Sequence, residues 1–205
     1  MKKYSLSMCI VAIAWTIFFQ SSCNNTSPAG QTTEPAKKEL THGAQVERGK
    51  YLVTTMGCND CHSPKKMTPQ GPAIDSTQTL SGYHSGMSLP PIDKAALKPG
   101  NWVLFTPDLT AAVGPWGISY SANITPDTAT GIGSWSEDEF IKTLRTGKHL
   151  GQDGGRPILP PMPWTDFAQA NDEDLKAIFA YLQALPPISN KVPAPVSPIE
   201  AAKLK

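Results

Sequence analysis

The feature that most constrains this chain is the short motif Cys58-x-x-Cys61-His62. The sequence has four cysteines, and the other two, Cys9 and Cys23, lie close to its start. The body of the chain therefore carries a single cysteine pair, which excludes a fold held together by several internal disulfides. Any fold must instead present two thiols within about one helical turn, with an imidazole directly beside them.

Three kinds of site use a close cysteine pair. A thioredoxin-like redox site places it in a βαβ pattern, which does not flank this motif. A structural zinc site needs four ligands, and the sequence has neither a second pair nor two closely spaced histidines. The third kind is covalent attachment of haem c, whose signature is Cys-x-x-Cys-His. We therefore predict one covalently bound haem c, with Cys58 and Cys61 as its thioether links and His62 as a ligand of the iron.

The N-terminal residues predict export. Two lysines precede an almost wholly apolar run over residues 8–19, which is short for a membrane span, and small residues follow it. We interpret residues 1–22 as a signal peptide of the lipoprotein type, although Gln20 stands where that type usually has an aliphatic residue. Cys23 would then be lipidated, residues 23–43 would form a flexible polar tether, and the protein would be periplasmic or outer-face and membrane-anchored.

Charge and composition narrow the remaining possibilities. The formal net charge is +1 and no long basic cluster occurs, so nucleic acid is not expected as a partner. The 20 prolines and 16 glycines predict much irregular backbone and few helices.

Apolar periodicity and capping residues predict three helices, over about 44–56, 136–147 and 172–185. The long stretch 68–133 carries turn signals and is expected to be mostly loop. We therefore predict an all-α fold with long Pro- and Gly-rich loops. Gly49 lies on the apolar face of the first helix, where close contact with another helix would explain a residue that costs about 1 kcal/mol against Ala.

The second axial ligand of the haem iron has several candidates. Met162 lies between prolines in a segment that joins the second and third predicted helices, and a stiff loop loses little entropy when it presents a thioether to iron. We favour Met162 over the rivals, which are Met67, Met87, His84 and His149. The second ring nitrogen of His62 needs a fixed partner, and the carbonyl of Pro64 or Pro72 is expected to supply it.

Together these motifs resemble class I cytochrome c, in particular the cytochrome c domains found with exported bacterial dehydrogenases. The resemblance is carried by segments 58–64, 122–127, 130–135, 144–147, 159–163 and 172–175. It covers roughly residues 46–187 and implies a helical fold around one haem, Met162 as the axial ligand and helix contact near Gly49. We assign residues 44–190 to this cytochrome c domain and residues 191–205 to an irregular tail.

The resulting functional hypothesis is a one-electron carrier, not an enzyme. Its expected partners are redox proteins: a dehydrogenase, a respiratory oxidase or another cytochrome. The alternatives are a peroxidase-like haem enzyme and a haem gas sensor, which both need a labile sixth ligand. Two sets of cations are either functional or ordinary surface charges: Arg145, Lys148 and Arg156 could face the haem propionates, and Lys65 with Lys66 could form a docking rim.

Overall fold

A computed structural model describes residues 40–204. The predicted signal peptide, Cys23 and most of the predicted tether lie outside the described residues, and the last two residues of that tether, 42 and 43, are helical and not part of a tether. In chain order the elements are α1 (His42–Thr55), α2 (Cys58–His62), β1 (Lys65–Thr68), β2 (Gly71–Ile74), η1 (Lys94–Leu97), β3 (Leu104–Phe105), β4 (Ala111–Gly114), β5 (Gly117–Tyr120), α3 (Glu137–Thr146), η2 (His149–Gly151), α4 (Trp164–Phe167), α5 (Asp172–Gln183) and α6 (Pro198–Ala201). None of the helices in this part of the chain is long and apolar enough to cross a bilayer.

The three predicted helices are confirmed as α1, α3 and α5, and local chemistry explains their ends. Ser136 caps α3 and forms a capping box with Glu139, while Gly147 ends that helix in the left-handed conformation. The side chain of Asn171 accepts a hydrogen bond from the Asp174 amide and so begins α5. These caps satisfy backbone groups that a helix end otherwise leaves without partners.

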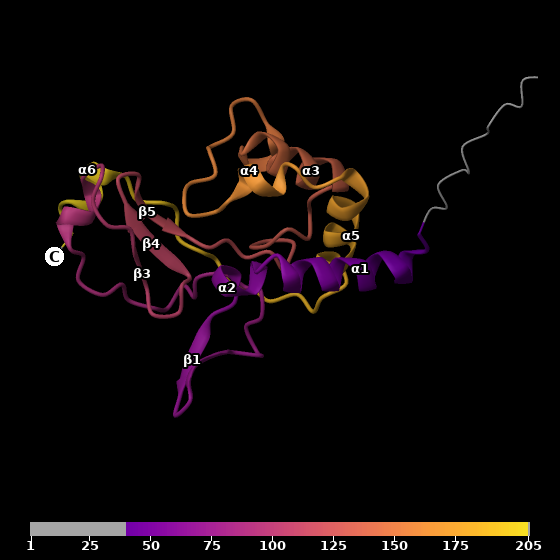
Figure 1. Ribbon diagram of the computed structural model, residues 1–205, viewed down its shortest axis with the longest axis horizontal. Helices are drawn as coiled ribbons and strands as arrows, with labels where there is room; N and C mark the ends of the chain where they lie inside the picture. Colours follow the sequence, from indigo (N-terminus) through magenta and orange to yellow (C-terminus); the bar gives the residue numbers. More distant parts are fainter. Residues whose placement is uncertain (1–39, 205) are drawn as a thin grey trace, which may run out of the picture. The chain divides into compact units, whose positions relative to one another are not determined.

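The expectation of an all-α fold is wrong, because the chain also contains two small antiparallel sheets. One is the hairpin of β1 and β2, and the other has the strand order β3-β4-β5 (Figure 1). These strands could not be predicted from the sequence because they are four residues or shorter and do not alternate between buried and exposed positions. Strand β4 is buried throughout, so it lacks the period of two that marks a half-buried strand.

The described residues form two apolar cores. The larger core joins α1, α3 and α5 through residues such as Val53, Leu144 and Leu175. The smaller core lies between β4, β5, η1 and α6, and contains Ala96, Val113, Ile118 and Ala201. Residues 191–205, expected to be irregular, therefore include a capped helix, α6, and Val196 forms a β-bridge with Ile118. The tail completes the smaller core.

Helices α1 and α5 lie against one another (Figure 1). They meet at Gly49, which is buried. A Cβ atom built on Gly49 would lie 1.9 Å from the carbonyl oxygen of Ala177 and 2.7 Å from Cβ of Tyr181. The expected helix contact near Gly49 is confirmed, because only a residue without a side chain permits this approach.

Replacing Gly49 with alanine tests this contact. We expect Gly49→Ala to lower the free energy of unfolding by about 1–3 kcal/mol, because the new methyl group overlaps the backbone of α5. Gly43→Ala is the matched control in the same helix, since a Cβ at Gly43 meets nothing within 4 Å. The control should be neutral or stabilising by up to about 1 kcal/mol. Urea unfolding measures both, and equal effects would contradict the contact.

Candidate functional site

The cysteine motif forms its own short helix, α2, directly after α1. Gly57 precedes it in the left-handed region, with φ of 72°, which turns the chain between the two helices. Cys58 and Cys61 are free thiols, both half-buried. Burial raises the pKa of Cys58 to about 11 and also raises the pKa of Cys61. Both thiols are thus held protonated near neutral pH, one helical turn apart.

His62 is buried and its ring is fixed by one backbone carbonyl. Its Nδ1–H donates to the carbonyl oxygen of Ala122 at 2.8 Å, which leaves Nε2 as the nitrogen able to bind a metal. Burial lowers the pKa of His62, more than the bond to Ala122 raises it, and so favours the neutral, ligating form. The expectation that Pro64 or Pro72 supplies the carbonyl is wrong: the Pro64 carbonyl accepts from the Asp75 amide at 2.8 Å.

Residues Gly82 and Tyr83 hold the backbone on both sides of the bond between His62 and Ala122. The amide of Tyr83 donates to Ser121 O at 2.9 Å, and the amide of Gly82 donates to His62 O at 2.8 Å. A Cβ on Gly82, whose φ is +77°, would lie 2.4 Å from Ser121 O. Residues 82 and 83 therefore join His62 to the stretch 121–122, which carries the carbonyl that holds its ring.

Met162 lies on a loop that packs against the larger core. Both Met162 and Cys58 contact this core cluster, and Met162 is half-buried. The loop is tied to the end of α3, where the Ile158 amide donates to Gly147 O at 2.7 Å. Within the loop, the Trp164 amide donates to Met162 O at 2.9 Å. The rival Met67 is 73% exposed on the β1–β2 hairpin. Among the sulfur ligands considered, Met162 is the one that shares an apolar cluster with the cysteine motif.

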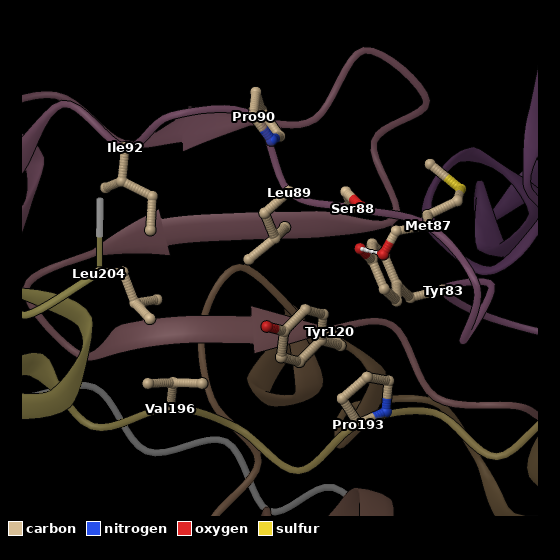
Figure 2. A pocket seen from close by; sticks show the side chains of 10 residues that line it. All are labelled: Tyr83, Met87, Ser88, Leu89, Pro90, Ile92, Tyr120, Pro193, Val196 and Leu204. Carbon is tan, nitrogen blue, oxygen red and sulfur yellow. Dashed lines mark hydrogen bonds between the residues drawn. The ribbon is translucent and has the colours of Figure 1, made fainter.

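The other rival methionine, Met87, lies at a cleft of about 470 Å³ beside the smaller core. Figure 2 shows that the hydroxyl of Tyr83 donates a hydrogen bond to the backbone carbonyl of Met87, at 2.7 Å. The ring of Tyr83 lies 4.8 Å from that of Tyr120, centroid to centroid. The side chain of Met87 is 40% exposed, so it is a surface residue of this cleft.

The two histidine rivals each have a contact close by in the chain or structure. His84 is exposed, and its Nδ1 accepts from the Gly86 amide at 3.1 Å. His149 is half-buried and meets the ring of Trp135 edge-on at 5.3 Å.

Two of the three cations considered for propionate contacts have other partners. Arg145 pairs with Asp172 at 2.5 Å and also donates to the carbonyl of Ala168. Lys148 pairs with Asp153 at 3.3 Å. Arg156 is exposed and stays a candidate. Arg145 acts in this structure as a tie between α3 and the start of α5.

Lys65 and Lys66, considered as a docking rim, have different surroundings. The Nζ of Lys65 donates to the carbonyls of Asp60 at 2.5 Å, Asp108 at 2.7 Å and Ser63 at 3.4 Å. Lys66 is exposed and pairs with Asp75 at 2.9 Å; hydrogen bonds from Thr77 and Lys66 lower the pKa of Asp75 to about 2. Lys65 is thus a structural residue that joins α2 to the turn before β4.

These residues fit a covalently attached haem c. The structure provides two free thiols on one turn, a neutral buried imidazole with one nitrogen fixed, and a thioether on the same apolar cluster. In residues 40–204 no group of three or more His, Cys, Asp or Glu side chains gathers as a zinc site would require. The sequence did not indicate the carbonyl contact of Ala122 with His62 or the structural role of Lys65, because both depend on contacts between residues far apart along the chain.

Comparison with known proteins supports this interpretation. The family model of cytochrome c matches residues 46–186. The gluconate 2-dehydrogenase cytochrome c subunit of Pantoea cypripedii is 33% identical over 67% of this chain and 22% of its own length. The cytochrome c subunit of alcohol dehydrogenase (quinone) from Gluconobacter oxydans is 32% identical over 73% of this chain and 24% of its own length.

A third similarity is closer but shorter. One subunit of the nicotinate dehydrogenase of Pseudomonas putida is 44% identical over 39% of this chain, which is 6% of that protein's length. The chain spans about a quarter or less of the length of these curated relatives.

The contacts of Lys65 give a testable contrast with its neighbour. We expect Lys65→Met to lower the free energy of unfolding by about 1.5–3 kcal/mol, because a charged donor to three carbonyls is lost. Lys66→Met, the control, removes an exposed ion pair and should cost less than about 1 kcal/mol. Denaturant unfolding compares the two, and a cost for Lys65→Met no larger than that for Lys66→Met would refute the structural role.

Proposed function

This chain belongs to the cytochrome c family, and on that premise we propose that it carries electrons one at a time through a single covalently attached haem c. As a member of that family it is an electron-transfer protein and not a catalytic subunit. A haem c bound here supplies an iron couple that cycles between its ferric and ferrous states.

The observation that carries the proposal is the arrangement of α2. Cys58 and Cys61 offer two protonated thiols for thioether links, and His62 directs Nε2 away from the carbonyl that holds Nδ1. A buried ring with one fixed nitrogen can keep the same orientation in both oxidation states. Little rearrangement then accompanies electron transfer.

We assign the sixth ligand to Met162. Its thioether is half-buried on the cluster that Cys58 also contacts, and its loop is tied to the end of α3 by the bond from the Ile158 amide to Gly147 O. Prolines at 160, 161 and 163 limit the freedom of the loop before folding. A thioether ligand raises the reduction potential relative to a second histidine, which suits an electron carrier.

The proposed partner is an exported dehydrogenase, from which electrons pass to a respiratory acceptor. The support is that several relatives are named as cytochrome subunits of gluconate, fructose and alcohol dehydrogenases. The chain matches only part of each, so it would serve as one haem-carrying domain for such a partner. A brief encounter of this kind needs only a small interface.

Export and lipidation complete the proposal. Covalent haem attachment takes place outside the bacterial cytoplasm, and residues 1–22 have the pattern of an export signal. Acylation of Cys23 would hold the domain at a membrane through the tether of residues 23–43.

Substitution of Met162 tests the axial ligand. We expect Met162→Ala to lose the weak red absorption band of a thioether–ferric iron bond and to bind carbon monoxide readily when reduced, because the sixth position opens. Met87→Ala is the control, since Met87 lies at the surface cleft. Absorption spectra of the oxidised, reduced and carbon monoxide-treated proteins report the outcome. An unchanged Met162→Ala spectrum would remove this assignment, and ready carbon monoxide binding by the reduced wild-type protein would favour a labile-ligand enzyme or sensor.

The number and linkage of haems can be measured directly. Intact-mass spectrometry of protein made with haem-attachment machinery should find a mass increase of one haem that survives denaturation and acid–acetone extraction. In the doubly substituted Cys58→Ser, Cys61→Ser protein that increase should vanish after extraction. More than one haem, or a covalent haem in the double variant, would contradict the proposal.

A further inference from the structure

One short segment, Ser119 to Ala122, contacts the surroundings of both proposed axial ligands. At one end, the Ser119 hydroxyl donates to the carbonyl oxygen of Pro160 at 2.6 Å, two residues before Met162. At the other end, the carbonyl of Ala122 accepts from Nδ1 of His62 at 2.8 Å. The segment runs from the end of β5 into the stretch that follows it.

The Ser119 hydroxyl has a defined direction. The indole Nε1–H of Trp116 donates to Ser119 Oγ at 3.2 Å, and since indole nitrogen is only a donor, the serine proton is left for Pro160. Ser119 is 8% exposed, so water competes little for this bond. In this chain of hydrogen bonds, Trp116 therefore donates to Ser119, and Ser119 donates to the Pro160 carbonyl.

Strand β5 is a firm support for this contact because it is paired on both edges. Strand β4 pairs with it along one edge. On the other edge, the amides of Ile118 and Val196 each donate to the other's carbonyl, at 2.9 and 3.0 Å. Beyond the strand, the Ser121 amide donates to Thr110 O at 2.8 Å, which fixes the stretch that leads to Ala122.

The Met162 loop needs an anchor of this kind. Three of the residues from 159 to 163 are prolines, which have no N–H, so the loop has few backbone donors of its own. The internal bond from the Met162 amide to Leu159 O is long, at 3.4 Å. In the part of the chain that the structure describes, the Ser119 hydroxyl is the hydrogen-bond donor to Pro160 O.

We propose that Ser119 is a positioning residue for Met162: through Pro160 it fixes the loop of the sixth ligand to the same backbone segment that orients His62. This inference rests on the proposed ligation by Met162. The segment from Ser119 to Ala122 acts as a brace between the two proposed iron ligands, His62 and Met162, and loss of the hydroxyl releases Met162 alone.

The test compares Ser119→Ala with Ser121→Ala in the haem-loaded protein. Ser121 is two residues away and contributes only backbone atoms to the hydrogen bonds of the described residues, so it is a matched control. Imidazole added to the oxidised protein must displace Met162 to reach the iron, and its apparent affinity measures how firmly the loop is held. Spectroscopic titration gives this affinity for wild type, both serine variants and Met162→Ala.

We expect Ser119→Ala to bind imidazole about fivefold to tenfold more tightly than wild type, as loss of one partly buried hydrogen bond predicts. Ser121→Ala should match wild type, and Met162→Ala should bind most tightly of all. Should Ser119→Ala not accumulate as haem-loaded protein, Ser119→Cys, with a weaker donor of similar size, should shift in the same direction.

Two outcomes separate the inference from the function on which it rests. Wild-type affinity in Ser119→Ala, together with tight binding in Met162→Ala, would overturn the brace and leave Met162 as the ligand. Wild-type affinity in Met162→Ala would remove the ligand itself, and the brace with it. Thermal unfolding of both serine variants tests whether a general loss of stability explains the result. If their melting temperatures fall equally while only Ser119→Ala binds imidazole more tightly, the brace is supported.

Discussion

The hydrogen bond from His62 to the carbonyl of Ala122 is the contact on which the arrangement of this site depends. It selects the ring nitrogen that can bind iron, and it joins the cysteine motif to a segment sixty residues further along the chain. The neighbouring bond from Gly82 to the carbonyl of His62 and the close approach of Gly82 to Ser121 strengthen the same junction. The helices bury the apolar surface, but this junction fixes the direction of the imidazole.

The three-stranded sheet therefore contributes to the proposed haem site and is more than an addition to a helical core. Strands β4 and β5 share the smaller apolar core with η1, and α6 and Val196 complete it. From that second core the chain reaches His62 through Ala122 and the Met162 loop through Ser119. Lys65, the first residue of β1, adds a third connection, because its side chain donates both to the carbonyl of Asp60 in α2 and to the carbonyl of Asp108 just before β4.

Local signals explain which features the sequence could predict. The haem motif needs five adjacent residues, and α1, α3 and α5 have caps and apolar stripes within their own length. The contact at Gly49 was expected because glycine is costly inside a helix. Met162 was singled out by its prolines, and its ligation stays a prediction.

The sheets and the partner of His62 could not be predicted for the opposite reason. Strand β4 is buried on both faces and β1 begins with two lysines, so neither has the alternation that reveals a strand. The choice of Ala122 over Pro64 depends on tertiary contact alone, since any backbone carbonyl offers the same acceptor. A backbone carbonyl is the same for every residue type, so the sequence does not indicate which one His62 contacts.

The pairing of Val196 with Ile118 has a consequence for the order in which this protein is made. A chain emerges from its N-terminus first, so the motif of α2 is available long before the residues that close the second edge of β5. Val196 and α6 also lie beyond the stretch matched by the cytochrome c family, which ends at residue 186. Until these late residues arrive, one edge of β5 is unpaired, and the segment from Val196 to Ala201 then covers it.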